Sequence, residues 1–232
     1  MKKNYIIGID TETCNSLIDE KDKLDLSQSL VYDVGWQVVD KQGRPQIKRS
    51  FVVYEIFTNN VLMSSAYYKD KIPQYWKEIK SGKRILKTFK NIRLQFLADR
   101  KKYNCKVVFA HNAFFDYNAL NNTLRYLTKS KYRYFFPYSL EIWDTLKMAH
   151  DVFGTSPKYF QFCEKNGFMT NHKTPRPRMT AEVLYRYISE NNDFTENHTG
   201  LEDVEIETEI LIKCLKSRKK IRKTLFKKRV SF

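Results

Sequence analysis

The first quarter of the chain contains short apolar runs, rich in β-branched and aromatic residues, that alternate with polar stretches. Such runs are typical of buried strands. They cover residues 4–9, 31–40 and 47–57, and Gln42-Gly43 marks a turn between the last two. The pattern predicts three consecutive strands, of which the second and third form a hairpin.

Beyond residue 83 the apolar positions recur every three or four residues, which is the spacing of one helix face. The first such face consists of Ile85, Phe89, Ile92 and Phe96. After it the pattern predicts strands over 106–110 and 141–143 and helices over 116–128, 144–153, 181–190 and 199–217. Residues 154–179 contain three prolines and are expected to be loop-rich. This order predicts an α/β fold in which helices cover a mixed sheet.

Composition adds a core and a class of partner to this picture. Apolar residues make up 42% of the 232 residues and aromatic residues 15%, which argues against a disordered chain. The net charge of +16 favours a polyanionic partner, either nucleic acid or an anionic membrane. Most of the basic excess lies in segments 69–106 and 213–232, so the remainder is slightly acidic. Acidic side chains inside a basic protein are candidates for metal binding.

The same features set the expected organisation of the chain. We expect one domain over residues 1–217, with a basic insertion at about 58–105, and a basic C-terminal tail over 218–232. Four scattered cysteines without a C-x-x-C pair argue against a disulfide framework or a zinc ribbon. Since no run of 18 apolar residues occurs, we expect no membrane span and a cytoplasmic location.

Several acidic residues stand where the predicted elements begin or end. Asp10 and Glu12, two apart on a strand, point to the same side, and such a pair can bind Mg²⁺ or Mn²⁺ through oxygen. Asp116 follows a buried strand, at the edge of the sheet where active sites collect. Asp203 opens the last helix. Taken singly, these residues also fit a solvated strand end or a helix cap.

Two histidines have the same spacing to an acid. His198 precedes Asp203 by five residues, and His111 precedes Asp116 by five. Spacing alone therefore leaves both histidines as candidates for proton transfer, with an exposed loop histidine as the alternative for His198.

Three motifs together resemble a known family. Asp10-Thr-Glu12, His111-Asn-Ala-Phe-Phe-Asp116 and His198-Thr-Gly-Leu-Glu-Asp203 resemble, in order, the motifs of DEDDh-type (DnaQ-like) 3′→5′ exonucleases. The sequence resembles the phage or bacterial type of this family and is similar to proofreading exonuclease subunits of bacterial DNA polymerases. The resemblance covers residue 4 to about residue 215. The chain departs from the family at Cys14-Asn15, where a Thr-Gly pair is common, and in a longer segment 58–83.

The resemblance implies an RNase H-like fold with a five-stranded mixed sheet flanked by helices. It implies two divalent ions, Mg²⁺ or Mn²⁺, held by Asp10, Glu12, Asp116 and Asp203, with His198 as general base. It makes His111 a residue of the second motif and assigns substrate contacts to Thr11, Thr13, His111, Asn112 and Phe115.

The expected function is metal-dependent 3′→5′ hydrolysis of DNA, with single-stranded ends as substrate and nucleoside 5′-monophosphates as products. The expected partners are single-stranded DNA and a DNA polymerase or other replication protein, and no membrane. Lysines and arginines such as Arg84, interleaved with Tyr67, Tyr68, Tyr75 and Trp76, could track phosphates and stack bases. The alternatives are an RNA-directed exonuclease of the same fold and a non-catalytic nucleic-acid- or polymerase-binding module. That all five catalytic positions are filled argues against the module.

Overall fold

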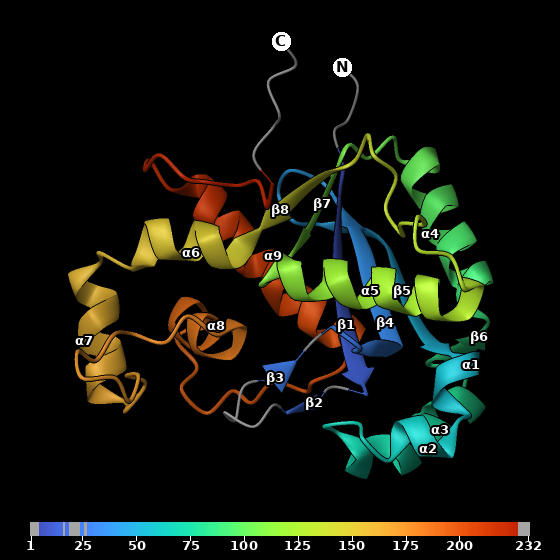
Figure 1. Ribbon diagram of the computed structural model, residues 1–232. Helices are drawn as coiled ribbons and strands as arrows, with labels where there is room; N and C mark the ends of the chain where they lie inside the picture. The colour runs from blue at the N-terminus through green and yellow to red at the C-terminus, as the bar shows by residue number, and fades with distance from the viewer. Residues whose placement is uncertain (1–4, 16, 19–23, 26, 227–232) are drawn as a thin grey trace.

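The computed structural model describes residues 5–15, 17–18, 24–25 and 27–226 and is built around one six-stranded sheet (Figure 1). Its strands are β1 (Ile6–Cys14), β4 (Leu30–Val39), β5 (Pro45–Val53), β6 (Ile85–Lys87), β7 (Val107–Ala110) and β8 (Glu141–Asp144). The strands β2 (Leu17–Ile18) and β3 (Leu24–Asp25) pair separately.

The sheet is mixed and has the strand order β6-β5-β4-β1-β7-β8. β1, β4 and β5 pair antiparallel, so the predicted hairpin is confirmed. β7 and β8 run parallel to β1, and β6 runs parallel to β5. The predicted α/β class with a mixed sheet is therefore confirmed, with six strands in the main sheet instead of five.

Helices cover both faces of this sheet. They are α1 (Tyr54–Phe57), α2 (Asn60–Met63), α3 (Ile72–Lys80), α4 (Phe89–Lys102), α5 (Ala113–Thr128), α6 (Thr145–Phe153), α7 (Pro157–Lys165), α8 (Ala181–Ser189) and α9 (Gly200–Lys216), with a 3₁₀ turn η1 (Lys69–Lys71) before α3. Helices α4 and α5 pack on one face, and α6, α8 and α9 pack with one another on the opposite face (Figure 1).

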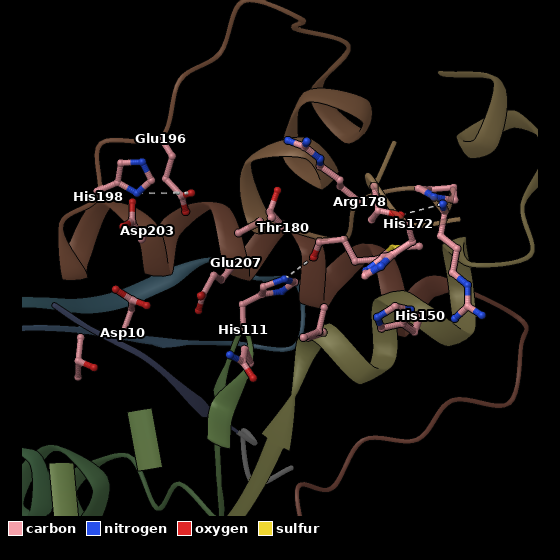
Figure 2. A pocket seen from close by; sticks show the side chains of 18 of the residues that line it. Asp10, His111, His150, His172, Arg178, Thr180, Glu196, His198, Asp203 and Glu207 are labelled. Atoms are coloured by element: carbon pink, nitrogen blue, oxygen red, sulfur yellow. Dashed lines mark hydrogen bonds and ion pairs between the residues drawn. The ribbon is translucent and has the colours of Figure 1, made fainter. Parts of the chain in front are cut away.

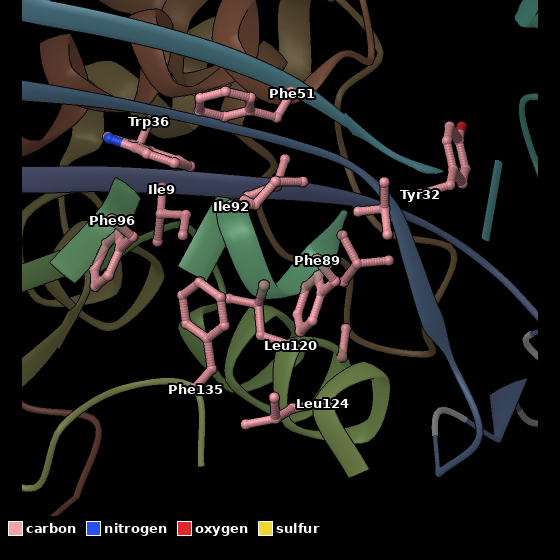
Figure 3. Packing of buried hydrophobic residues seen from close by; sticks show 14 of the residues in the cluster. Ile9, Tyr32, Trp36, Phe51, Phe89, Ile92, Phe96, Leu120, Leu124 and Phe135 are labelled. Atoms are coloured by element: carbon pink, nitrogen blue, oxygen red, sulfur yellow. The ribbon is translucent and has the colours of Figure 1, made fainter. Parts of the chain in front are cut away.

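Aromatic residues fill the core under α4 and α5 (Figure 3). Trp36 of β4 contacts Phe51 and Phe96, with ring centroids 4.9 and 5.7 Å away. Phe96 in turn packs against Phe135, which is fully buried. The apolar face predicted from Phe89, Ile92 and Phe96 is thus the core face of α4, because burial of that face is what stabilises the helix.

Three boundaries differ from the sequence prediction. Ile85 belongs to the edge strand β6, because residues 85–87 pair with residues 51–53, and Thr88 then caps α4. The segment expected to be loop-rich contains α7, since Ser156 caps it and Pro157 occupies its first turn, where proline is tolerated. The third strand ends at Val53 and α1 follows directly.

The described part of the predicted C-terminal tail, up to Phe226, lies against the sheet. The Leu225 N–H donates to the Ile142 carbonyl at 2.8 Å, and the Asp144 N–H donates to the Lys223 carbonyl at 2.8 Å. Residues 227–232 of that tail lie outside the described residues.

All four cysteines are buried and free. Within the described ranges, no helix is long and apolar enough to cross a membrane.

Candidate active site

A cavity of about 1000 Å³ opens beside the middle of β1 (Figure 2). Asp10 and Glu12 both line it. The sequence predicted that these carboxylates follow the end of the strand. The strand instead continues to Cys14, so both lie within β1. The pairing of β1 with β4 shifts register between Glu12 and Thr13. The two-residue spacing nevertheless places both acids at the same cavity.

Asp116 lies in the first turn of α5, beside Asp10. The helix begins at Ala113, three residues earlier than predicted, and Asn112 at the cap position has a left-handed conformation (φ 62°). Asp116 is 2% exposed, and the Thr11 hydroxyl donates to its Oδ1 at 2.9 Å. This bond ties the carboxylate to β1.

Two glycines let α9 touch the sheet backbone. A Cβ on Gly35, which pairs with Asp10, would lie 2.1 Å from the Leu201 nitrogen. A Cβ on Gly200 would lie 2.6 Å from the Gly35 nitrogen. Only glycine permits this approach, and it brings Asp203, in the first turn of α9, to the acids of β1.

Thr199-Gly-Leu-Glu202 has the spacing of a capping box, in which Glu202 would accept from the Thr199 backbone N–H. The backbone N–H of Thr199 donates to Asp203 Oδ2 at 2.9 Å. Glu202 instead accepts from the Thr199 hydroxyl and pairs with Arg84 at 3.1 Å and Lys83 at 2.9 Å. Asp203 therefore takes the position that a capping glutamate would hold, because the buried Arg84 competes for Glu202.

Burial and mutual repulsion perturb these carboxyl groups. Burial raises the pKa of Asp203 to about 8 and that of Asp116 to about 7. The pKa of Asp10 is well above its usual range, first because of burial and then because of repulsion by Asp116 and Glu207. Lys71 offsets part of this repulsion at Glu12. Acids this close together are stabilised further when a cation lies between them.

Glu207 was not predicted from the sequence. It lies one turn beyond Asp203 on the same face of α9, is 3% exposed and lines the cavity between Asp10 and His111 (Figure 2). Its Oε2 has no hydrogen-bond partner. A buried, unpartnered carboxylate oxygen at a cluster of acids fits a cation site. The i,i+4 spacing to Asp203 was the signal that could have identified it.

His198 joins this cluster from the loop before α9. Ligand atoms of His198, Glu12 and Asp203 lie within 4.8 Å of one another, a donor set that suits a hard divalent cation. The His198 backbone is left-handed (φ 46°), and its Nδ1 lies 3.8 Å from Oε2 of Glu196. Burial and the nearby Lys71 lower its pKa, so the imidazole is neutral at pH 7.

His111 has a different environment. Its Nε2 lies 2.7 Å from the Met179 carbonyl and its Nδ1 lies 3.1 Å from the Thr145 hydroxyl. Both ring nitrogens are occupied, and burial lowers its pKa. Of the two histidines with equal spacing to an acid, His198 has a ring atom grouped with Glu12 and Asp203, and His111 does not.

The residues expected to contact substrate fall into two groups. Thr11, His111 and Asn112 line the cavity, whereas Thr13 and Phe115 are not among its lining residues. The cavity also contains Tyr68 and Glu196, neither of which was predicted to contribute to catalysis. Burial raises the pKa of Glu196 to about 7.

The aromatic residues proposed to stack on bases are also divided. Tyr75 is buried and donates to Asp33 at 2.7 Å, so it is a core residue and that interpretation was wrong. Arg84, proposed to contact phosphates, is fully buried against Asp33 and Glu202. Tyr67 is 85% exposed, and Trp76 is partly exposed against Phe57.

Two solved structures resemble the chain over most of its length. One is exonuclease X in complex with 5′ overhanging duplex DNA, with 18% identity, a TM-score of 0.39 and 90% of each chain covered. Another is S. pombe Pop2p in its Mg²⁺- and Mn²⁺-bound form, with 10% identity, a TM-score of 0.47, and 90% of this chain and 81% of Pop2p covered. No family model and no curated protein matches the sequence. Likeness at this level carries no argument about activity, so any functional assignment rests on the site itself.

Proposed function

We propose that the protein is a metal-dependent 3′→5′ exonuclease of the DEDDh, DnaQ-like type on an RNase H-like fold. The observation that carries the proposal is the convergence of Asp10, Glu12, Asp116 and Asp203, from three separate elements, with the side chain of His198 beside them. These residues are the ones that the three sequence motifs supply. The proposed substrate is single-stranded DNA, and the products are nucleoside 5′-monophosphates.

The four motif carboxylates would hold two divalent ions, Mg²⁺ or Mn²⁺, with Glu207 as a fifth carboxylate beside them. When bound, such ions supply charge stabilisation at the phosphodiester and activation of water. The residues fit this role because their carboxyl groups repel one another when ionised and because Oε2 of Glu207 has no other partner.

His198 is proposed as the general base. Its lowered pKa leaves it neutral near pH 7, as a base requires. Nδ1 faces Glu196, so we assign acceptance of the water's proton to Nε2. The imidazolium that forms would be stabilised by the carboxylate of Glu196.

A labelled-strand assay tests this function. Single-stranded DNA and RNA of equal length, labelled at the 5′ end, are incubated with the protein in Mg²⁺, Mn²⁺ or EDTA. A ladder of single-nucleotide steps that requires metal, with 5′-monophosphate products, supports the exonuclease. Binding without cleavage in every metal would favour the non-catalytic module, and a ladder on RNA alone would favour the RNA-directed enzyme.

Matched variants make the assay specific. Asp203→Asn removes one carboxylate without changing its shape, and we expect loss of about a thousandfold or more in cleavage. Glu205→Gln, on the same helix, removes a half-exposed carboxylate that pairs with Lys48. It should cleave like the unmodified protein. Equal activity of both variants would contradict the assignment.

A role beside a DNA polymerase is the setting that the motif resemblance suggests. Preference for a mismatched over a matched 3′ end, measured on primer–template duplexes, would support proofreading. Equal rates on both ends would favour an exonuclease that acts independently of replication.

A further inference from the structure

The cavity carries opposite charges at its two ends. Figure 2 shows Arg178, His172 and His150 across the cavity from Asp10 and Asp203. Lys173 and Arg176 line the cavity as well. Metal ions and a single nucleotide at the acidic end would not account for these basic side chains, so the basic end suggests a separate binding role.

The basic end is formed by residues 169–178, which we name the basic arm. Met169 and Pro177 form an isolated antiparallel bridge at its base. The Thr170 N–H donates to the Arg176 carbonyl at 2.8 Å, and the Arg176 N–H donates to the Thr170 hydroxyl at 3.0 Å. These bonds give the arm a defined hairpin shape between α7 and α8.

Two further contacts tie the arm to the rest of the fold. The Tyr159 hydroxyl donates to the Arg178 carbonyl at 2.5 Å. Nε2 of His111 lies 2.7 Å from the carbonyl of Met179, the residue that follows the arm. The base of the arm is thereby connected to the second sequence motif, which begins at His111 and ends at Asp116. These hydrogen bonds fix the position of the arm relative to the acids.

The arm's cations are not neutralised by protein carboxylates. Among the described residues, Lys173, Arg176 and Arg178 form no ion pair, and all three are exposed. Some other cations are neutralised, since Arg84 pairs with Asp33 and Arg222 with Asp151 at 2.6 Å. Unpaired cations beside a cavity lined by acids form a surface that attracts an anionic ligand.

We propose that the basic arm is a binding site for the sugar–phosphate backbone of the substrate strand, at a phosphate away from the bond being cleaved. The proposal rests on the proposed exonuclease function. A strand that enters the cavity brings several phosphates, and those beyond the acids need cations of their own. Lys173 and the guanidinium groups of Arg176 and Arg178 supply them, and the imidazoles of His150 and His172 add hydrogen-bonding groups.

Equilibrium binding tests the arm separately from catalysis. The affinity for fluorescein-labelled dT12 is measured in EDTA over a range of NaCl concentrations, for the unmodified protein and for K173A/R176A/R178A. We expect the slope of log K against log salt to become shallower by about 2, because each phosphate contact to a single strand contributes about 0.7. The affinity for dT3, which has only two internucleotide phosphates, should change far less than that for dT12.

A charge-matched control separates the arm from general electrostatics. K90A/K101A/K102A removes three exposed lysines of α4, outside the cavity, and so changes the net charge equally. Its slope should shift by about 0.5 or less. Because Arg178 Nε donates to the Met169 carbonyl at 3.2 Å, its loss could disturb the arm. K173A/R176A keeps that bond and should still make the slope shallower by about 1.4.

The outcomes distinguish the arm proposal from the exonuclease proposal. Equal changes in the arm and α4 variants, or an unchanged slope in the arm variants, would overturn the proposal. Equal losses on dT12 and rU12 would support backbone contact, whereas a loss on only one of them would overturn it in favour of sugar or base recognition. A metal-dependent ladder with no arm effect removes the arm proposal alone. Arm-dependent binding without any ladder removes the exonuclease proposal and leaves the arm as a strand-binding site.

Discussion

The ring of Tyr68 lies face to face with the imidazole of His198, with centroids 4.6 Å apart and planes 13° apart. The ammonium group of Lys71 lies over the same Tyr68 ring, 5.0 Å from its centroid, and donates to the Asn197 carbonyl. Segment 58–83 therefore contacts the loop that carries the proposed base. The stack fixes the plane of an imidazole whose own backbone is left-handed.

Replacing Tyr68 tests whether this stack positions His198. Tyr68→Ala should lower kcat on single-stranded DNA by about threefold to tenfold, because an aromatic pair contributes about 0.5–1.5 kcal/mol. Tyr68→Phe keeps the ring and should restore kcat. If Tyr68 instead contacts substrate, Tyr68→Ala will raise KM and leave kcat unchanged. Steady-state kinetics on both variants, with melting temperatures as the folding control, separate these results.

The raised carboxyl pKa values predict how stability depends on pH and on metal. A carboxyl group whose folded pKa is raised stabilises the fold below its unfolded pKa, near 4, and this contribution is lost as pH rises through the folded value. Those values are about 7 for Asp116 and about 8 for Asp203. In EDTA the melting temperature should therefore fall between pH 5 and pH 8.

Divalent cations should reverse this loss, because they neutralise the ionised carboxylates. The gain in melting temperature on adding Mg²⁺ or Mn²⁺ should be larger at pH 8 than at pH 5. Asp203→Asn should flatten the pH dependence in EDTA. Differential scanning fluorimetry over the same buffers gives all three results, and a metal gain that does not vary with pH would contradict the prediction.

Glu207→Gln tests the buried carboxylate that faces the cavity. The variant removes a charge that repels Asp10, so the metal-free protein should be more stable at pH 8 than the unmodified protein. Its Mn²⁺ affinity should fall by about tenfold or more, the usual effect of altering a group that supports a metal ligand. Titration with Mn²⁺ followed by electron paramagnetic resonance measures this affinity, with the half-exposed Glu205→Gln as control. Unchanged affinity in both variants would show that Glu207 takes no part in metal binding.

The buried Arg84 connects β4 to the start of α9. It pairs with Asp33 at 3.1 Å and Glu202 at 3.1 Å, and Asp33 also accepts the Gly200 N–H at 3.0 Å. Arg84→Met should lower the free energy of unfolding by about 3–5 kcal/mol, since it leaves a buried carboxylate unpaired. Lys83→Met removes an exposed partner of the same Glu202 and should cost about 1 kcal/mol or less. Urea unfolding of both variants measures the difference, and equal costs would contradict the role assigned to Arg84.

The parts of the fold that sequence could predict are those with a local signature. The hairpin of β4 and β5 has an alternating pattern and a Gln42-Gly43 turn, and α4 has an apolar face. Strand β6 has neither, because Ile85 is 47% exposed and its pairing partner Phe51 lies far away in sequence. Pairing with β5 makes residues 85–87 a strand, although the spacing of Ile85 from Phe89 fits a helix.

The candidate site shows the same division. Paired spacings identified Asp10 with Glu12 and His198 with Asp203, and the structure brings these four side chains together. Glu207 was not predicted, because its burial depends on how closely α9 approaches the sheet. That approach depends on glycine contacts between residues distant in sequence, which no local pattern records.

The packing of residues 223–225 along β8 changes how the basic C-terminal segment can be studied. β8 is the last strand of the sheet order, and exposed edges of this kind invite pairing with other chains. Ending the chain at residue 218 would remove basic charge and would also expose the edge of β8 that residues 223–225 now cover. A truncated protein that lost nucleic-acid affinity would therefore be prone to self-association as well. Substituting lysines in place keeps the strand cover and isolates the contribution of charge.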